Sequence, residues 1–498
     1  MRRTALRLAG IAGAVALLAS CATRDALRTE ARACDRLAVA DCGKYSIELA
    51  EEEYVEDGKS VRGPLETGPN VQGPYSYRLG FVEFDDHGAP LAPEQLNGIL
   101  GLIRDEPGDL AIVLYIHGWK HNAADADNDV KEFRWVLRGL DSVEQTRPEG
   151  QRRKVVGIYA GWRGNSVHPA VEGNPVTGTI ATAPKQLTFW TRKNAAHRIA
   201  KGSIRDLFAA VRDVQRRHNN RPLPSAPGRC GDTRLVLIGH SFGGLIVYDA
   251  VHQHLIESAR ASVRDGGLVD SYGNMVVLLN PAFEGVAYDS LHRLAAQRER
   301  YADGQAPVLV TFQSENDWAT GNVFPIGRAV STTFERPRTD EQRRENWQAM
   351  GHVERFRTHR LELTEGQAAA PRRATATASP ESEPRPALAP ERQAQRTRAV
   401  DAKRDAAGAR PALDELYFLD RRVRLRHLDG SRLPPDSPFW VVSTDPKILY
   451  GHNEIWNDDF LVTLNELYSY FVRPSTSGCA IPPRRSAGRS AAGSRRAG

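Results

Sequence analysis

The serine at position 241 stands in a sequence that suits a nucleophile. The motif GHSFG over residues 239–243 follows the apolar run Leu235–Gly239 and precedes a helical stretch over Gly244–Ala259. A G-x-S-x-G sequence between a strand and a helix forms a tight turn in which the glycines permit a strained serine, whose hydroxyl projects above the sheet. The helix N-terminus beneath it favours developing negative charge. We therefore predict that Ser241 is a nucleophile.

The elements that must hold this serine are short apolar runs alternating with helical stretches. Runs without polar alternation are typical of strands buried on both faces of a parallel sheet. Strands that alternate with helices predict right-handed βαβ units, and hence an α/β fold with a mostly parallel sheet. Further predicted strands are Tyr77–Asp85, Ala111–Ile116, Val155–Ala160, Met275–Leu279, Val308–Phe312 and Phe439–Ser443. Further predicted helices are Pro93–Asp105, Val130–Leu140, Gln186–Arg217, Ser290–Tyr301 and Ile455–Phe471.

Composition divides the chain into a folded part and several polar segments. Residues 21–74 are polar and irregular, which predicts a tether before a single domain over 75–472. Within that domain, residues 366–412 are rich in Ala, Pro, Arg and Glu, and we expect a disordered insert before the last strand. The flanking Arg355–Leu363 and Leu416–His427 are strand-like and predict a hairpin from which the insert emerges. The basic tail over 473–498 is expected to be disordered as well.

The first residues of the chain are typical of an export signal. Residues 1–20 combine a basic start with an apolar stretch that is too short to cross a bilayer as a helix. The segment ends in LASC over 18–21, which resembles the lipobox of bacterial lipoproteins. That resemblance implies lipidation of Cys21 and a lipid-anchored place in the cell envelope, with outer-membrane or periplasmic sorting favoured by Ala22. The alternative is an ordinary secretory signal with an incidental cysteine.

Four further cysteines suit an oxidising compartment. Cys34 and Cys42 are close enough in sequence to close a small loop, while Cys230 and Cys479 would tie a surface loop to the tail. Their spacing matches no zinc pattern, and the pairing stays open at this point.

The net charge of +6, from 67 Lys and Arg against 61 Asp and Glu, is unevenly placed. Three arginines lie in the first seven residues, six lie in the tail, and the insert has more basic than acidic residues. The rest of the chain is therefore net acidic, and nucleic acid is not an expected partner. Binding of an anionic polymer through the insert and tail is the alternative that this charge leaves open.

These motifs together resemble the α/β-hydrolase superfamily. The resemblance covers roughly residues 75–472 without the insert. It depends on the sequence HGW at 117–119 after a predicted strand and on GHSFGG at 239–244, as in bacterial esterase- or lipase-like proteins. It implies an eight-stranded, mostly parallel sheet with helices on both faces. It also implies that the backbone N–H groups of Trp119 and Phe242 form an oxyanion hole. A metal site at His117, His121 and Asp125 is the competing interpretation of the first motif.

The resemblance also implies which residues would activate the serine. The acid is expected after the run Val308–Phe312, where Asp317 is the best match and Glu315 the second, with Glu284 as a more distant alternative. The alternative is a purely structural role for Asp317 as a helix N-cap. The base is expected to be His452, in the loop before the last helix. The order Ser241, Asp317, His452 is the order that the superfamily uses.

The expected activity is hydrolysis of carboxylic esters, on small-molecule or lipid substrates, by a monomer that needs no metal or organic cofactor. A lipoprotein with a vestigial triad that acts as an envelope-binding module is the alternative. The long segment 161–190 is expected to form a lid or pocket wall. Aromatic residues near the expected site either line an acyl pocket or belong to the core: Trp119, Trp162, Phe189, Trp190 and Trp318.

Overall fold

The computed structural model describes residues 25–36, 38–39, 41–51, 76–145, 147–164, 185–222, 230–331, 336–364, 413–419 and 421–471. The predicted signal peptide, Cys21, the insert over 366–412 and the tail over 473–498 lie outside these residues. Within the described ranges, no helix combines the length and the apolar character that a membrane crossing requires.

The described strands form one sheet in the order β1-β2-β3-β5-β4-β6-β7-β8-β12-β9-β11-β10. From β3 to β9 along this order, every neighbouring pair is parallel, whereas β2 is antiparallel to β3 and β11 is antiparallel to both β9 and β10. The α/β class and the mostly parallel sheet are confirmed, but the prediction of eight strands is wrong. The strands are β1 (Glu30–Asp35), β2 (Tyr45–Glu51), β3 (Ser76–Phe84), β4 (Leu110–Ile116), β5 (Lys154–Trp162), β6 (Arg234–His240), β7 (Met275–Leu279), β8 (Leu309–Ser314), β9 (His359–Leu363), β10 (Glu415–Phe418), β11 (Val423–His427) and β12 (Phe439–Thr444).

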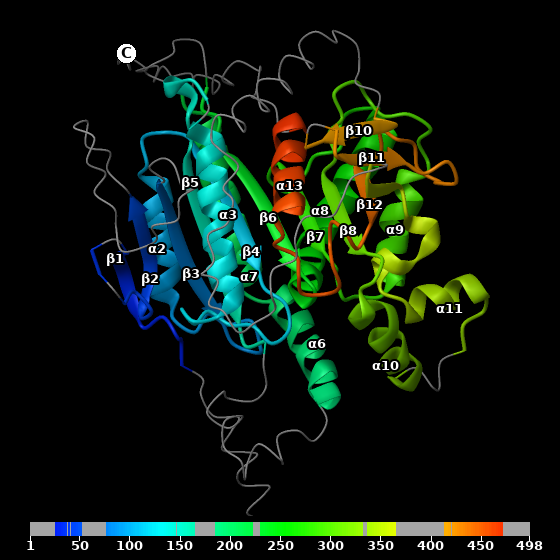
Figure 1. Cartoon of the computed structure of the whole chain (residues 1–498), viewed down its shortest axis with the longest axis horizontal. Helices are drawn as coiled ribbons and strands as arrows, with labels where there is room; N and C mark the ends of the chain where they lie inside the picture. Colours follow the sequence, from blue (N-terminus) through cyan, green and yellow to red (C-terminus); the bar gives the residue numbers. More distant parts are fainter. Residues whose placement is uncertain are drawn as a thin grey trace, which may run out of the picture.

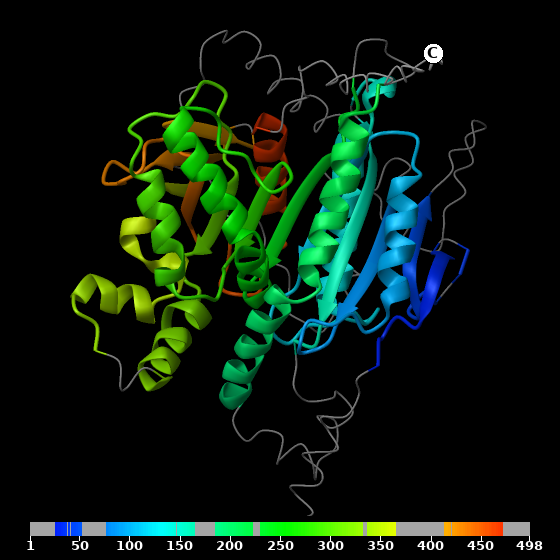
Figure 2. The ribbon, with the colours of Figure 1, turned by 180° about the vertical axis from the view of Figure 1, so that it is seen from behind.

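Helices cover both faces of this sheet, as predicted. On one face, α3 (Asn128–Gln145) and α13 (Asp458–Phe471) pack over an apolar layer, and Figure 1 shows both helices in front of the strands. The other face, in front in Figure 2, is covered by several helices with the larger core beneath them. These are α2 (Pro93–Arg104), α6 (Lys185–Lys201), α7 (Ile204–Asn219), α8 (Phe242–Asp265) and α9 (Gly285–Ala295). Shorter helices are α10 (Phe324–Ser331), α11 (Asp340–Trp347), η1 (Glu149–Gln151), η2 (Ala319–Val323), η3 (Met350–His352) and η4 (Glu354–Phe356).

The predicted helix over Gln186–Arg217 is two helices. The chain breaks between α6 and α7 because the turn at Gly88 packs against this point, where Ser203 N–H donates to the Gly88 carbonyl over 2.8 Å. A Cβ atom at Gly202 would lie 2.6 Å from that same carbonyl oxygen, so the approach depends on glycine. The contact joins segments far apart in the sequence, and the helical pattern alone did not indicate it.

The two strand-like segments around the insert pair in antiparallel register, as predicted, but the second segment contains one strand more than the predicted hairpin. The second segment contains two strands, β10 and β11, which pair with each other in antiparallel register. Strand β9 pairs with β11 from Val423↔Leu363 to His427↔His359. The insert therefore connects β9 to a separate two-stranded hairpin at one edge of the sheet.

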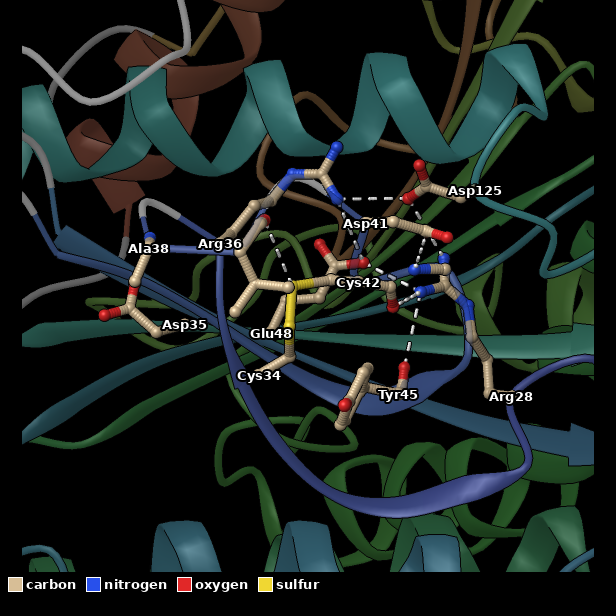
Figure 3. The surroundings of a disulfide bond; sticks show 12 residues. Arg28, Cys34, Asp35, Arg36, Ala38, Asp41, Cys42, Tyr45, Glu48 and Asp125 are labelled. Atoms are coloured by element: carbon tan, nitrogen blue, oxygen red, sulfur yellow. Dashed lines mark hydrogen bonds and ion pairs between the residues drawn. A yellow bond between two sulfur atoms is a disulfide. The ribbon is translucent and has the colours of Figure 1, made fainter.

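The predicted tether is wrong over residues 25–51, because this segment supplies the edge strands β1 and β2. Its polar residues include a buried ion cluster: Glu48 is fully buried, and its carboxylate accepts from Arg28 over 2.9 Å and from Arg134 over 2.8 and 3.0 Å. Figure 3 shows Arg28 and Arg36 directed at Glu48 and Asp125. A polar composition predicted irregular structure, but here the charges neutralise one another inside the fold.

One of the cysteine pairs suggested by the sequence is present. Cys34 and Cys42 form a disulfide with a Cα–Cα distance of 5.8 Å, next to the ion cluster (Figure 3). Cys230 is also disulfide-bonded, while Cys479 lies outside the described residues.

Removing the disulfide between Cys34 and Cys42 is expected to destabilise the protein. The bond has a sequence separation of 8, and closing a loop of that size is worth about 2.5 kcal/mol through the entropy of the unfolded chain. The variant Cys34→Ala/Cys42→Ala should have a free energy of unfolding that is lower by that amount. Urea denaturation measures it as a lower midpoint, with an unchanged dependence of the free energy on urea concentration. An unchanged midpoint would contradict a stabilising role.

Candidate active site

Ser241 occupies a strained turn between β6 and α8. Its φ of 55° and ψ of −117° lie outside the regions that side-chain-bearing residues favour. The turn is tight: a Cβ at Gly239 would lie 2.5 Å from the Gly243 carbonyl oxygen, and a Cβ at Gly243 would lie 2.1 Å from the Ile116 carbonyl oxygen. Backbone hydrogen bonds on both sides hold the strained residue, because Ser241 N–H donates to Leu279 and its carbonyl accepts from Ala282.

The structure brings Ser241, His452 and Asp317 together. Ser241 Oγ lies 2.8 Å from Nε2 of His452, and Nδ1 of His452 lies 2.8 Å from Oδ2 of Asp317. A hydroxyl that donates to Nε2 requires the imidazole proton on Nδ1, where it donates to the carboxylate. The three side chains come from loops after β6, β8 and β12, at one edge of the sheet, as the sequence predicted.

Asp317 is buried and surrounded by hydrogen-bond donors. Its Oδ1 accepts from the backbone N–H groups of Ala319 and Thr320 over 3.0 and 3.1 Å. Its Oδ2 accepts from the Thr320 hydroxyl over 2.5 Å and from Gln313 Nε2 over 3.1 Å. Burial would raise the pKa of Asp317, but His452 and these hydrogen bonds outweigh it and hold the pKa well below the ordinary value. The carboxylate is therefore ionised and fixed, and it also caps the turn that follows.

The alternative acids lie elsewhere. Glu315 accepts from Ser443 Oγ over 2.8 Å and pairs with Arg360 over 3.1 Å. Glu284 forms ion pairs with Lys193 and, over 3.0 Å, with Arg328. Only Asp317, of the three acids considered from the sequence, contacts His452.

Two residues that the sequence did not single out hold the backbone of His452. Nε2 of His240 donates to the His452 carbonyl over 2.8 Å, and Asn280 Nδ2 donates to the carbonyls of Gly451 and His452 over 2.9 and 3.1 Å. Burial, and then the nearby His452, lower the pKa of His240 to about 3. His240 is thus a neutral donor, and its place inside the GHSFG motif was the available signal.

A second histidine extends the hydrogen-bonded chain behind Asp317. The Thr320 hydroxyl donates its proton to Asp317, so the 2.9 Å contact between Thr320 Oγ1 and Nε2 of His352 has the imidazole as donor. Burial lowers the pKa of His352 to about 4, which keeps this imidazole neutral. No sequence spacing indicated His352, because it comes from a short 3₁₀ turn.

The loop after β4 lies against the serine. A Cβ at Gly118 would lie 3.0 Å from the Ser241 Cβ and 2.8 Å from Nδ1 of His240. Trp119 follows directly, and Phe242 is the first residue of α8, where backbone N–H groups have no partner within the helix. The two residues predicted as oxyanion donors therefore flank the serine from different elements.

His117 and His121 have separate partners and do not share a site with Asp125. Trp162 N–H donates to His117 Nε2 over 3.0 Å, so the imidazole proton of His117 is on Nδ1. This Nδ1–H donates to the Gly118 carbonyl over 2.9 Å. His121 Nδ1 lies 2.9 Å from Asp127 Oδ1, while Asp125 belongs to the arginine cluster. The suggested metal ligands are not brought together, and they order the loop instead.

The ion pair of His121 should make stability depend on pH. Burial lowers the pKa of His121, but Asp129 and Asp127 outweigh it and raise the pKa to about 9. Since the folded pKa exceeds the ordinary 6.5, this contribution is fully present below pH 6.5 and is lost as pH rises through about 9. We expect His121→Gln to lower the unfolding free energy by about 2–3 kcal/mol at pH 6 and by much less at pH 10. Urea denaturation of wild type and variant at both pH values measures this difference in unfolding free energy. An equal difference at pH 6 and pH 10 would refute the ion-pair account.

The aromatic residues noted in the sequence take different places. Phe189 packs edge-on against Trp119 with ring centroids 5.5 Å apart and contacts Phe242 at 4.7 Å, so these rings lie beside the serine. Trp162 is buried and stacks on His117, whereas Trp318 is 65% exposed. The predicted lid over 161–190 is described only at its ends, because residues 165–184 lie outside the described part.

Comparisons of the chain with protein-family models, with curated proteins and with solved structures found no match.

Proposed function

We propose that this protein is a serine hydrolase of the α/β-hydrolase type that cleaves carboxylic esters through an acyl-enzyme intermediate. The observation that carries the proposal is the continuous chain of hydrogen bonds from Ser241 through His452 to a buried, ionised Asp317. A hydroxyl bonded to an imidazole, which a third group orients, is the arrangement of an activated nucleophile. The strained turn at Ser241 adds support, because strain held at a single residue often marks a functional site.

In this mechanism the Ser241 hydroxyl attacks the acyl carbonyl carbon while His452 Nε2 takes its proton. Asp317 keeps the tautomer and stabilises the imidazolium, which then gives the proton to the departing alcohol as the C–O bond breaks. Water, deprotonated by His452, attacks the acyl-enzyme and releases the acid. The N–H groups of Trp119 and Phe242 are proposed to bind the oxyanion, a contribution typically worth about 3–4 kcal/mol per donor.

The anchor is part of the same proposal. Lipidation of Cys21 would place the enzyme on the bacterial cell envelope, in the periplasm and preferably on the outer membrane, as a monomer acting on small-molecule or lipid esters. Metabolic labelling with a radioactive fatty acid in wild type and in Cys21→Ser tests the anchor separately from activity.

The experiment that tests the activity is a series of p-nitrophenyl esters of increasing acyl length, combined with labelling by a fluorophosphonate probe. We expect burst-phase hydrolysis of at least one ester and covalent labelling at Ser241. A protein that takes no label and hydrolyses no ester would instead be the vestigial, envelope-binding form.

A further inference from the structure

The first described residues of the chain lie at the same edge of the sheet as Ser241. Leu27 and Arg28 donate their N–H groups to the Glu83 carboxylate over 3.0 and 2.9 Å, at the carboxyl end of β3. Nε of Arg28 donates to the carbonyl of Ala123 over 2.9 Å, in the loop that follows β4. Figure 1 shows this segment, in dark blue, leaving the sheet on the side where α10 and the start of α6 project.

The lipid proposed on Cys21 would be within reach of this edge. Asp25 is the fourth residue after Cys21, and four extended residue steps span about 14 Å at most. Along the sheet order, β1 is five strand spacings from β6, which corresponds to about 24 Å across the sheet. A lipid on Cys21 therefore holds the carboxyl edge of the parallel strands near the bilayer and leaves the opposite edge away from it.

The far end of the same edge carries exposed apolar side chains. Trp318, directly after the loop from β8, is 65% exposed, and Ile326 in α10 is 66% exposed. Val286, at the start of α9 after β7, is 45% exposed. Tryptophan and aliphatic side chains at one rim suit the headgroup region of a membrane. Strand β6 and Ser241 lie between these residues and the anchored β1 in the sheet order.

Three acidic side chains at this edge have arginine partners. Asp86 is bonded to Arg192 over 2.7 and 2.9 Å, Glu284 to Arg328 over 3.0 Å, and Glu315 to Arg360 over 3.1 Å. At these three positions the edge offers paired carboxylates to an anionic membrane surface, which would repel unpaired ones.

We propose that the carboxyl edge of the sheet faces the membrane, and that the substrates are acyl esters of lipids in that membrane. The proposal rests on the ester hydrolase and the lipid anchor proposed above. Three features that follow one another along the sheet order support it. They are the short link to Cys21 before β1, the serine after β6, and the exposed Trp318 and Ile326 after β8. A lipid ester need then leave the bilayer only partly to reach Ser241.

The test compares two charge substitutions on the lipidated full chain, reconstituted in vesicles of phosphatidylethanolamine and phosphatidylglycerol that contain a fluorogenic diacyl lipid. Ile326→Glu places a charge at the proposed membrane contact, and the control Leu268→Glu places one after α8 at the opposite edge, where Leu268 is 52% exposed. We expect Ile326→Glu to lower vesicle hydrolysis about tenfold, as loss of one buried aliphatic contact predicts. Leu268→Glu should have no effect, and both variants should hydrolyse soluble p-nitrophenyl butyrate like wild type.

Equal vesicle rates for the two variants would overturn the proposed orientation, and so would soluble-ester turnover without any vesicle hydrolysis by wild type. Absence of turnover on both substrates, without fluorophosphonate labelling, would overturn the proposed hydrolase function itself. The soluble substrate therefore separates the two failures.

Discussion

Replacing Ser241 by alanine is expected to lower kcat for ester hydrolysis by about 10⁴- to 10⁶-fold, the loss typical of removing the nucleophile of a serine triad. The change removes only the hydroxyl that lies 2.8 Å from His452 Nε2. Alanine also leaves the fold intact, because it occupies the same turn between Gly239 and Gly243. Fluorophosphonate labelling should disappear together with turnover, and circular dichroism should be unchanged.

The matched control is Ser290→Ala. Ser290 Oγ also contacts a histidine, at 3.4 Å from Nε2 of His252, so this variant removes a Ser–His contact that lacks the orienting acid and the strained turn. We expect its kcat and its labelling to equal those of wild type. Full activity in Ser241→Ala would refute the proposed nucleophile, whatever the control does.

Several elements of the fold were predictable because their burial is uniform. The runs that form β4, β6 and β7 are buried at every residue, so no polar alternation obscured them. The edge strands β1 and β2 were missed for the opposite reason. In β2 the polar Glu48 is fully buried, and only its arginine partners from distant segments make that burial possible. Local composition cannot reveal a charge that is neutralised across the fold.

The candidate active site likewise has one part that the sequence predicted and one part that it did not. The serine, acid and base follow strands, and a parallel sheet brings such positions to one edge. Together with the motif order of the superfamily that the sequence resembles, this made Ser241, Asp317 and His452 predictable. The supporting hydrogen bonds were not. Asn280 and His352 act through side-chain directions within loops, which depend on the packing of several elements at once. The choice between Asp317 and Glu315 was left open for that reason, since both follow β8 within three residues of its end.

Replacing Asp317 by asparagine is expected to lower kcat by about 10⁴-fold while the protein stays folded. The carboxylate accepts the Nδ1 proton of His452 over 2.8 Å. An amide is able to present its NH₂ group there, which favours the tautomer with the proton on Nε2. That nitrogen then cannot take the proton of Ser241. The loss should fall in kcat rather than in KM, and steady-state kinetics on a soluble ester measures both.

Glu315→Gln separates this account from a general effect of losing a carboxylate after β8. Glu315 contacts Ser443 and Arg360 but not His452, so its neutralisation removes a partly exposed ion pair at the same loop. Such pairs contribute about 0–1 kcal/mol to stability, and we expect kcat to be unchanged. A large loss in Glu315→Gln with near-normal turnover in Asp317→Asn would reverse the assignment. It would mean that the loop rearranges when substrate binds and that Glu315 then replaces Asp317 beside the histidine.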